Sequence, residues 1–196
     1  MCSIIGFKGK YDKIVLNKIF LNSRIRGLHS FGFAYYDTNN AVQTFKTLDY
    51  NTFVNSINEI APDLFIAHFR YSTSGDYLEL SNNQPLIYKN SVFAFNGVIS
   101  QEKKEIMENQ YNIKMPSDND GYILFDKILK NDKEWLKNNN NITYACVWLS
   151  KGELYAKRNI NRPLYVSEIN KNTIYVSTKD IAKRSGITNY KLLNIC

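Results

Sequence analysis

A thiol stands directly after the first methionine of the chain. Cys2 leads into Ser3–Phe7, an apolar and β-branched run that predicts a buried strand. An aminopeptidase that removes Met1 before this small residue would leave the Cys2 thiol and a free α-amino group on one residue. An α-amine with a pKa of about 7.7–8.0 accepts a proton near neutral pH, so this residue would supply both a nucleophile and its base.

The same cysteine also has a purely structural interpretation, because a buried cysteine usually behaves as a small hydrophobic residue. Cys2, Cys146 and Cys196 are too few and too scattered for a disulfide framework or a zinc site. The two histidines, His29 and His68, do not stand at metal-ligand spacing from them. We therefore expect any chemistry to use no metal and no cofactor.

The length and composition fit a single domain over residues 1–196, with a hydrophobic fraction of 44%. No apolar stretch approaches the roughly 18 residues of a spanning helix, and the N-terminus lacks a signal-peptide pattern. We expect a cytoplasmic protein with no membrane partner. The net charge of +7 would suit nucleic acid or a nucleotide as partner, but lysines dispersed among Asn and Ile are equally typical of a solvated surface.

Apolar periodicity predicts helices alternating with antiparallel hairpins, which favours an α+β fold over a doubly wound parallel sheet. Predicted helices span Tyr11–Ser23, Tyr50–Ile60, Gln101–Gln110 and Asp120–Leu129, the last capped by Ser117 or Asp118. Predicted strands are Leu64–Tyr71 and the hairpin pairs Phe33–Tyr36 with Ala41–Phe45, Tyr144–Leu149 with Glu153–Ala156, and Pro163–Val166 with Thr173–Val176. In the second helix, the side chains expected to face inward are Phe53, Val54, Ile57 and Ile60.

Two further stretches bear on function. Residues 72–86 form a polar loop without periodicity, the kind of segment on which ligand contacts tend to lie. Asn96-Gly97 between apolar runs is, taken alone, the strongest short signal for a hairpin turn. The 9 glycines never occur in dinucleotide or P-loop spacing, which argues against nucleotide-driven chemistry.

Several short segments occur in a fixed order along the chain. They are Cys2-Ser3-Ile4-Ile5-Gly6, Arg26-Gly27 with Ser30 and Gly32, His68-Phe69-Arg70 with Ser72, Thr73 and Gly75, Asn82 with Pro85, Asn96-Gly97, Asp120, and Arg162-Pro163-Leu164. Together they resemble the glutaminase domain of class II glutamine amidotransferases, within the N-terminal-nucleophile (Ntn) hydrolases. The resemblance covers Cys2 to about Val166 and implies a four-layer αββα sandwich of two mainly antiparallel sheets.

The resemblance implies a role for each matching residue. Cys2 would attack the side-chain amide of L-glutamine, and the Asn96 amide and Gly97 N–H would stabilise the oxyanion. Arg70 would hold the α-carboxylate of the substrate, with Thr73 as a hydroxyl donor. Asp120 would hold the α-ammonium group.

Four further residues are expected to support the site. They are Arg26, His68, Tyr71 and Ser74. His68 is expected to form a hydrogen bond within the fold rather than to act as base, since the α-amine already fills that role. Ser74 stands where many members of the family have histidine.

Simpler interpretations remain for the substrate-binding residues. Arg70 at a strand end could pair with a surface acid, Asp120 could be only a helix cap, and Asp118 is a nearby competitor for its role. The resemblance as a whole implies a glutaminase that passes ammonia to a separate synthase subunit, since 196 residues leave no room for a synthase domain. The alternatives are an Ntn amidase acting on another amide, a non-catalytic glutamine-binding subunit, and a basic nucleic-acid-binding module.

Overall fold

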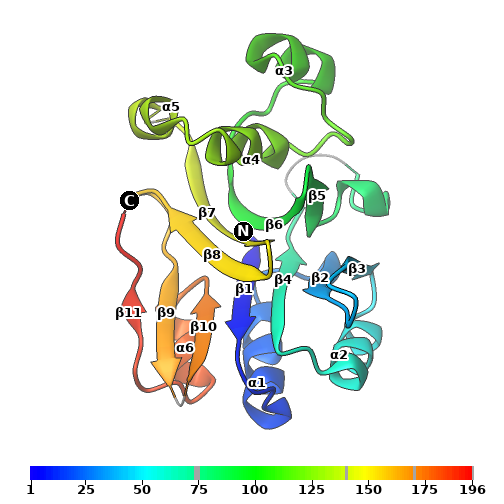
Figure 1. The fold of residues 1–196 in the computed structure, drawn as a ribbon, viewed down its shortest axis with the longest axis vertical. Coiled ribbons are helices and arrows are strands. Elements are labelled where there is room, and N and C mark those ends of the chain that lie inside the picture. The colour runs from blue at the N-terminus through cyan, green and yellow to red at the C-terminus, as the bar shows by residue number, and fades with distance from the viewer. Residues whose placement is uncertain (73–75, 140, 170, 196) are drawn as a thin grey trace.

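The structure is a computed structural model, and it describes residues 1–72, 76–139, 141–169 and 171–195 (Figure 1). The strands are β1 Ser3–Lys8, β2 Ser30–Tyr36, β3 Val42–Thr47, β4 Leu64–Arg70, β5 Leu86–Tyr88, β6 Ser91–Val98, β7 Thr143–Ser150, β8 Glu153–Arg158, β9 Tyr165–Ile169, β10 Asn172–Val176 and β11 Lys191–Leu192. The helices are α1 Lys13–Arg24, α2 Tyr50–Ile60, α3 Lys104–Tyr111, α4 Gly121–Leu129, α5 Lys133–Asn138 and α6 Lys179–Arg184, with a 3₁₀ turn η1 at Leu80–Asn82.

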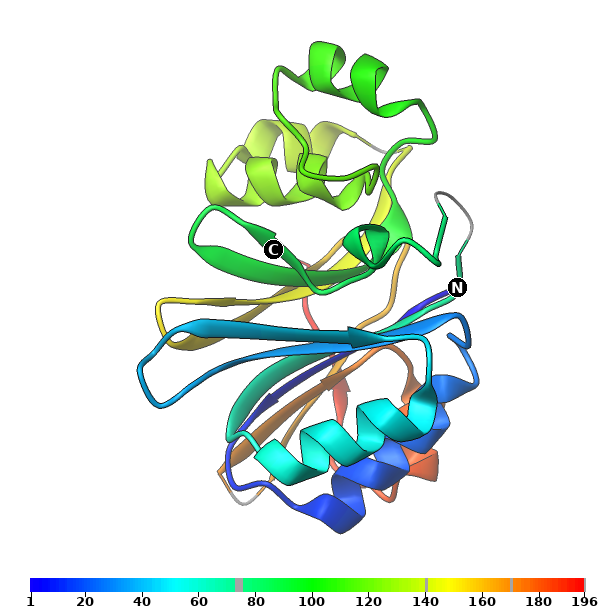
Figure 2. The same ribbon diagram turned by 90° about the vertical axis from the view of Figure 1, so that its right-hand side faces the viewer.

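Two antiparallel sheets lie face to face, each covered by helices on its outer side (Figure 2). The larger sheet has seven strands in the order β11-β9-β10-β1-β4-β2-β3, and α1, α2 and α6 pack on it. The smaller sheet has four strands in the order β5-β6-β7-β8, and α3, α4 and α5 cover it. The predicted four-layer αββα sandwich of two antiparallel sheets is confirmed.

Three apolar clusters hold the four layers together. Successive side chains of a strand point to opposite faces of the sheet, so one strand contributes residues to two of these clusters. In β1, Ile5 and Phe7 face the helices of the larger sheet, whereas Ile4 faces the smaller sheet. Gly6 shares the inner face with Ile4, and a Cβ there would lie 3.2 Å from Leu154 and Tyr175 side chains. The sheets therefore pack closely along β1.

The predicted helices and hairpins are largely confirmed, but the burial of Ile60 and the cap of α4 were predicted wrongly. Ile60 is 41% exposed, because it lies in the last turn of α2, beyond the buried Phe53 and Ile57. Asn96-Gly97 forms no turn and instead continues β6. The N-cap position of α4 is occupied by Asp120 rather than by Ser117 or Asp118.

None of the helices in the described part of the chain is long and apolar enough to cross a bilayer.

Candidate active site

Cys2 lies immediately before β1, where this strand meets the end of β4. Ser3 opposes Phe69 in the ladder, so the residue before it falls beside Arg70 and Tyr71. Cys2 Sγ accepts a hydrogen bond from Tyr71 N–H at 3.4 Å and lies 3.6 Å from Tyr71 carbonyl oxygen. Arg26 Nε donates to the Cys2 carbonyl oxygen at 3.3 Å. The thiol is thus fixed against backbone, and the carbonyl of the same residue is held by a guanidinium.

The surroundings of the Cys2 thiol act on its pKa in opposite directions. Burial is the largest effect and raises the pKa above its ordinary value. The Tyr71 backbone, the amino terminus, Arg70 and Arg26 all lower it, but by less. The resting thiol is therefore protonated near neutral pH and needs a base before it can act as a nucleophile.

Arg70 ends β4 on the face that points toward the smaller sheet, and only 6% of it is exposed. Its Nη1 donates to the Asn82 carbonyl oxygen at 3.4 Å and to the Asn83 side-chain oxygen. Burial lowers its pKa, while the charges of Cys2, Asp76 and Asp120 raise it. Arg70 is therefore a buried cation within electrostatic reach of Cys2, of Asp120 and of the exposed Asp76.

Asp120 occupies the cap position of α4, but its side chain makes no cap hydrogen bond. Its Oδ2 instead accepts hydrogen bonds from Ile99 N–H at 2.7 Å and Ser100 N–H at 3.1 Å, directly beyond β6. Burial raises its pKa, and these backbone donors lower it. The carboxylate is thus turned away from its own helix toward the end of β6. It also lines a cavity of about 300 Å³ with Asp118.

Asn96 and Gly97 lie near the end of β6. Asn96 is 3% exposed and shares the inner face of the sheet with Val92 and Ala94, which belong to the cluster between the sheets. It therefore points toward the larger sheet, which carries Arg70 on its facing side. Glycine is required at position 97, because a Cβ there would overlap the Thr143 carbonyl group of β7.

The direction of the Gly97 N–H follows from the ladder. Tyr144 opposes Gly97, yet Tyr144 N–H donates to Asn159 Oδ1 at 3.1 Å and its carbonyl accepts from Asn159 N–H at 3.0 Å. In an antiparallel ladder, two directly opposed residues either both point their N–H and C=O groups toward each other or both point them away. Because the backbone groups of Tyr144 point away from β6 toward Asn159, the Gly97 N–H points away from β7. Phe95 N–H points the same way and donates to Gln84 Oε1 at 2.6 Å. No side chain or loop carbonyl of the described residues accepts a bond from Gly97 N–H.

His68 is fully buried on the inner face of β4. Burial lowers its pKa to about 3, Arg70 and Lys46 act in the same direction, and the Phe95 backbone opposes them. Neither ring nitrogen reaches hydrogen-bond geometry with a described residue. The imidazole is therefore neutral at neutral pH, and the structure gives it no role as base.

The remaining predicted residues fall into two groups. Arg26 contacts Cys2 as described, and Tyr71 contributes its backbone to the thiol while its side chain is exposed. Thr73 and Ser74 lie outside the described residues.

Several residues around the site were not predicted from the sequence. His29 stacks between Tyr71 and Tyr77, with ring centroids 4.9 and 4.8 Å apart, and its Nδ1 accepts from Ser72 N–H at 2.9 Å. Gln84 binds the β6 backbone as described above. The sequence feature that could have pointed to Gln84 is its position in the polar segment directly before Pro85. No sequence feature of His29 other than its residue type could have pointed to it.

The fold of this chain is shared by several solved structures. No protein-family model and no curated protein matches the sequence. Among solved structures, glutamine phosphoribosylpyrophosphate amidotransferase from B. subtilis, complexed with ADP and GMP, aligns over 99% of this chain at 20% identity with a TM-score of 0.73. The fold is that of the class II glutamine amidotransferases. A structure described as a glutamine aminotransferase class-II domain protein (SPO2029) from Silicibacter pomeroyi aligns over 99% of this chain and 92% of its own, at 14% identity and a TM-score of 0.62.

The shared class II fold covers only part of the larger neighbours. This chain spans 46% of the B. subtilis enzyme and 45% of a structure described as the allosteric regulatory enzyme of purine biosynthesis, which aligns at 22% identity with a TM-score of 0.73. The chain therefore corresponds to less than half the length of these two proteins.

Proposed function

We propose that this chain is a cytoplasmic glutamine amidotransferase subunit that hydrolyses L-glutamine to glutamate and ammonia, with Cys2 as an N-terminal nucleophile. The observation that supports this best is the grouping of three charged or nucleophilic side chains at one end of the sandwich. Arg70 interacts electrostatically with both Cys2 and Asp120, although the three residues lie far apart in sequence. The class II fold supports the same function.

The base in this proposal is the α-amino group that Cys2 gains when Met1 is removed. Met1 Sδ lies 3.1 Å from Arg162 Nη1 and 3.6 Å from Arg26 Nη2, so two guanidinium groups border the N-terminal residue. The free α-amino group would lie on the same residue as the thiol and would accept its proton.

The reaction then proceeds in two halves. The amine takes the thiol proton, the Cys2 sulfur bonds to the amide carbon of glutamine, and the carbonyl oxygen becomes an oxyanion held by Asn96 and Gly97 N–H. Collapse of this intermediate breaks the C–N bond, and the leaving nitrogen takes a proton from the ammonium group and departs as ammonia. Water, deprotonated by the same amine, then attacks the thioester, and the released thiolate is reprotonated as glutamate leaves.

Substrate selection rests on two opposite charges. The buried Arg70 guanidinium suits the α-carboxylate of glutamine, with Thr73 as an additional donor, and the Asp120 carboxylate suits the α-ammonium group. A pocket that binds both charged ends would accept free glutamine and reject glutamine within a polypeptide.

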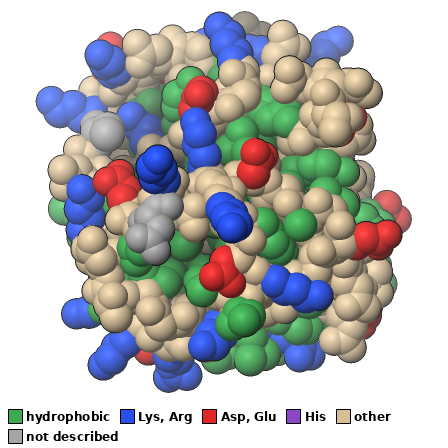
Figure 3. All heavy atoms as spheres, turned by 60° about the horizontal axis from the view of Figure 1, so that its bottom comes forward, with side chains coloured by type: hydrophobic (Ala, Val, Ile, Leu, Met, Phe, Trp, Pro, Cys, Tyr) green, Lys and Arg blue, Asp and Glu red, His purple; other side chains and the backbone are tan. Residues whose placement is uncertain are grey.

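The ammonia is proposed to pass to an acceptor on a separate synthase partner. In the two larger structural neighbours, more than half of the chain lies outside the region that aligns here. The nature of the acceptor is left open, including a nucleotide or nucleic acid. On the face in Figure 3, lysine and arginine side chains are dispersed and interspersed with acidic ones, so this face shows no single basic patch for nucleic acid.

The proposal is tested by ammonia release from L-glutamine, with the N-terminus of each protein defined by intact mass. We expect protein lacking Met1 to release ammonia and its Cys2→Ala variant to release none while keeping the fold. Cys146→Ala is the matched control, since Cys146 is fully buried in β7. Retention of Met1 in an active protein, or activity in Cys2→Ala, would overturn the mechanism. Retention of Met1 without activity would favour a non-catalytic glutamine-binding subunit.

A further inference from the structure

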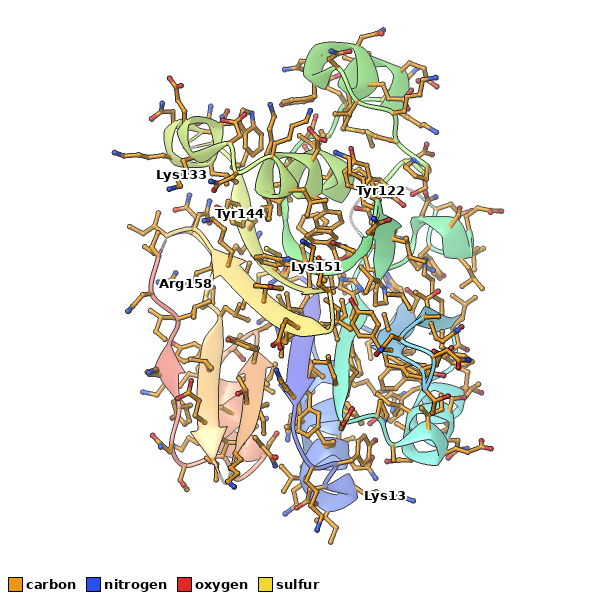
Figure 4. The ribbon with its side chains drawn as sticks, in the orientation of Figure 1. Lys13, Tyr122, Lys133, Tyr144, Lys151 and Arg158 are labelled. Carbon is orange, nitrogen blue, oxygen red and sulfur yellow. The ribbon has the colours of Figure 1, made fainter. Side chains whose placement is uncertain are left out.

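A second cavity lies beside the smaller sheet, next to α5 and the segment that follows β8. Its volume is about 660 Å³, within the usual range for small-molecule sites. It is bounded by α5, the start of β7, the segment after β8 and the end of the described chain, and Figure 4 shows Lys133, Tyr144 and Arg158 in this part of the molecule. The complete lining is Lys133, Leu136, Lys137, Asn139, Tyr144, Lys157, Asn159, Ile160, Asn161 and Ile195.

The charges around this cavity all have one sign. Lys133, Lys137 and Lys157 line it, and no lining residue is acidic. None of the three lysines forms an ion pair with any described residue, although other lysines of the chain do so. Among the described residues, the lining therefore carries three positive charges and no negative one.

The other walls of the cavity combine apolar side chains with the side chains of Asn139, Asn159 and Asn161. Ile160 is 76% exposed and Ile195 is 52% exposed, so burial of either by a ligand would be favourable. Arg158 fixes the surrounding segments by donating to the carbonyl oxygens of Leu193, Asn159 and Arg162, at 2.6, 2.9 and 3.1 Å. The cavity is thus preformed rather than dependent on a ligand for its shape.

We propose that this cavity binds a small molecule that carries an anionic group, such as a phosphate, sulfonate or carboxylate, on an apolar or planar body. The lysines would bind the anionic group, and Leu136, Ile160 and Ile195 would cover the apolar body. The site is connected to the β6–β7 ladder, because Asn159 in its wall holds both backbone groups of Tyr144, which opposes Gly97. Occupancy is therefore expected to change the glutaminase rate, and this second part alone rests on the proposed function.

Binding is tested with 8-anilinonaphthalene-1-sulfonate, an apolar anion, and with the neutral N-phenyl-1-naphthylamine as its uncharged counterpart, using ¹⁵N-labelled protein. We expect the sulfonate to shift the amide signals of Leu136, Tyr144 and Ile160 and to bind at least tenfold more tightly than the neutral compound. Changing Lys133, Lys137 and Lys157 together to methionine should weaken sulfonate binding at least tenfold. Changing Lys13, Lys18 and Lys179, on the opposite helical layer, should leave it unaltered.

Equal affinity for the two compounds, shifts confined to other surfaces, or no effect of the three lysine changes would overturn the proposed site. The regulatory part is tested by ammonia release at saturating probe. A change in kcat of at least twofold supports coupling to Gly97, and an unchanged kcat overturns the coupling while the NMR result decides the site by itself. A protein that binds the probe but has no glutaminase activity would leave the site standing and count against the proposed function.

Discussion

The two ends of the layer between the sheets differ in composition. At the end where Cys2 lies, the inner face carries the buried polar side chains of His68, Arg70 and Asn96. The middle of the layer is filled by apolar residues such as Ile66 and Val92. Beyond them, at the far end, turns with left-handed residues join β2 to β3, β5 to β6 and β7 to β8; those residues are Asn40, Lys89, Lys151 and Gly152.

This difference indicates what each end contributes. Burying a guanidinium, and an imidazole that has no hydrogen-bond partner among the described residues, is unfavourable for stability, whereas apolar packing with tight turns is favourable. A fold selected for stability alone would not place such groups between its sheets. The comparison predicts that changes at the Cys2 end mainly affect catalysis, and that changes at the far end mainly affect stability.

The largest effect is expected from Asn96→Ala at the Cys2 end. Loss of one oxyanion donor typically lowers kcat by about 100- to 1,000-fold, so ammonia release at saturating glutamine should fall by this amount. Asn90→Ala, in the exposed turn between β5 and β6 at the far end, is the matched control. If both variants kept a kcat within threefold of the wild type, Asn96 would have no part in the chemistry.

A smaller effect, on KM rather than kcat, is expected from Asp120→Asn. A hydrogen bond to a charged group contributes about 1.5–3 kcal/mol, so KM for glutamine should rise by about 10- to 150-fold. Asp118→Asn is the control, because Asp118 is exposed, neighbours Asp120 and was its competitor for the role. A rise in KM for Asp118→Asn alone would reverse the assignment.

The buried imidazole predicts a dependence of stability on pH. The His68 pKa is lowered to about 3 in the folded protein, whereas an unfolded histidine titrates near 6.5. Between these values the unfolded chain binds a proton that the folded chain does not, so the free energy of unfolding falls as pH decreases, by about 1.4 kcal/mol per pH unit from this residue. Urea unfolding at pH 4.5 to 7 measures this slope.

His68→Leu should flatten that slope, since it removes the group responsible. The other histidine provides the control, and His29→Asn should keep the slope. A slope that is unchanged in His68→Leu would show that the pH dependence comes from other groups.

The smallest effect is expected at the far end, from Gly152→Ala. Gly152 has φ of +75°, and a Cβ added at this residue would have no other atom within 4 Å, so the cost is backbone strain without a clash. Such strain amounts to about 1–2 kcal/mol, which should lower the melting temperature by a few degrees while kcat and KM stay unchanged. A loss of activity at unaltered stability would contradict the division between the two ends.

Much of the fold was predictable from the sequence because local signals agreed with one another. The helix at Tyr50–Ile60 and the hairpin around Gly152 both formed at the predicted residues. The hairpin turn that Asn96-Gly97 signals when taken alone does not form, because this local preference yields to strand pairing with β7 over the whole of β6. Short helices such as α5 and α6 give too little periodicity to be recognised.

The candidate site was predictable only in part. Arg70 and Asp120 were chosen by resemblance to family motifs, and in the structure Arg70 interacts electrostatically with both Asp120 and Cys2. The stacking of His29 between two tyrosines could not be predicted, because it depends on how the segment after β4 folds back over the start of β2. Side-chain contacts of this kind arise from tertiary packing and leave no periodic signal in the sequence.

The most direct measurement is covalent labelling of the Met1-free protein with a diazo-ketone analogue of glutamine, followed by peptide mass spectrometry. The chain offers three thiols for comparison, at Cys2, Cys146 and Cys196. We predict one adduct per chain, on Cys2, with loss of ammonia release in step with labelling and protection by L-glutamine. Inactivation with the adduct on Cys146 or Cys196, or continued ammonia release from fully labelled Cys2, would contradict the assignment of Cys2 as the nucleophile.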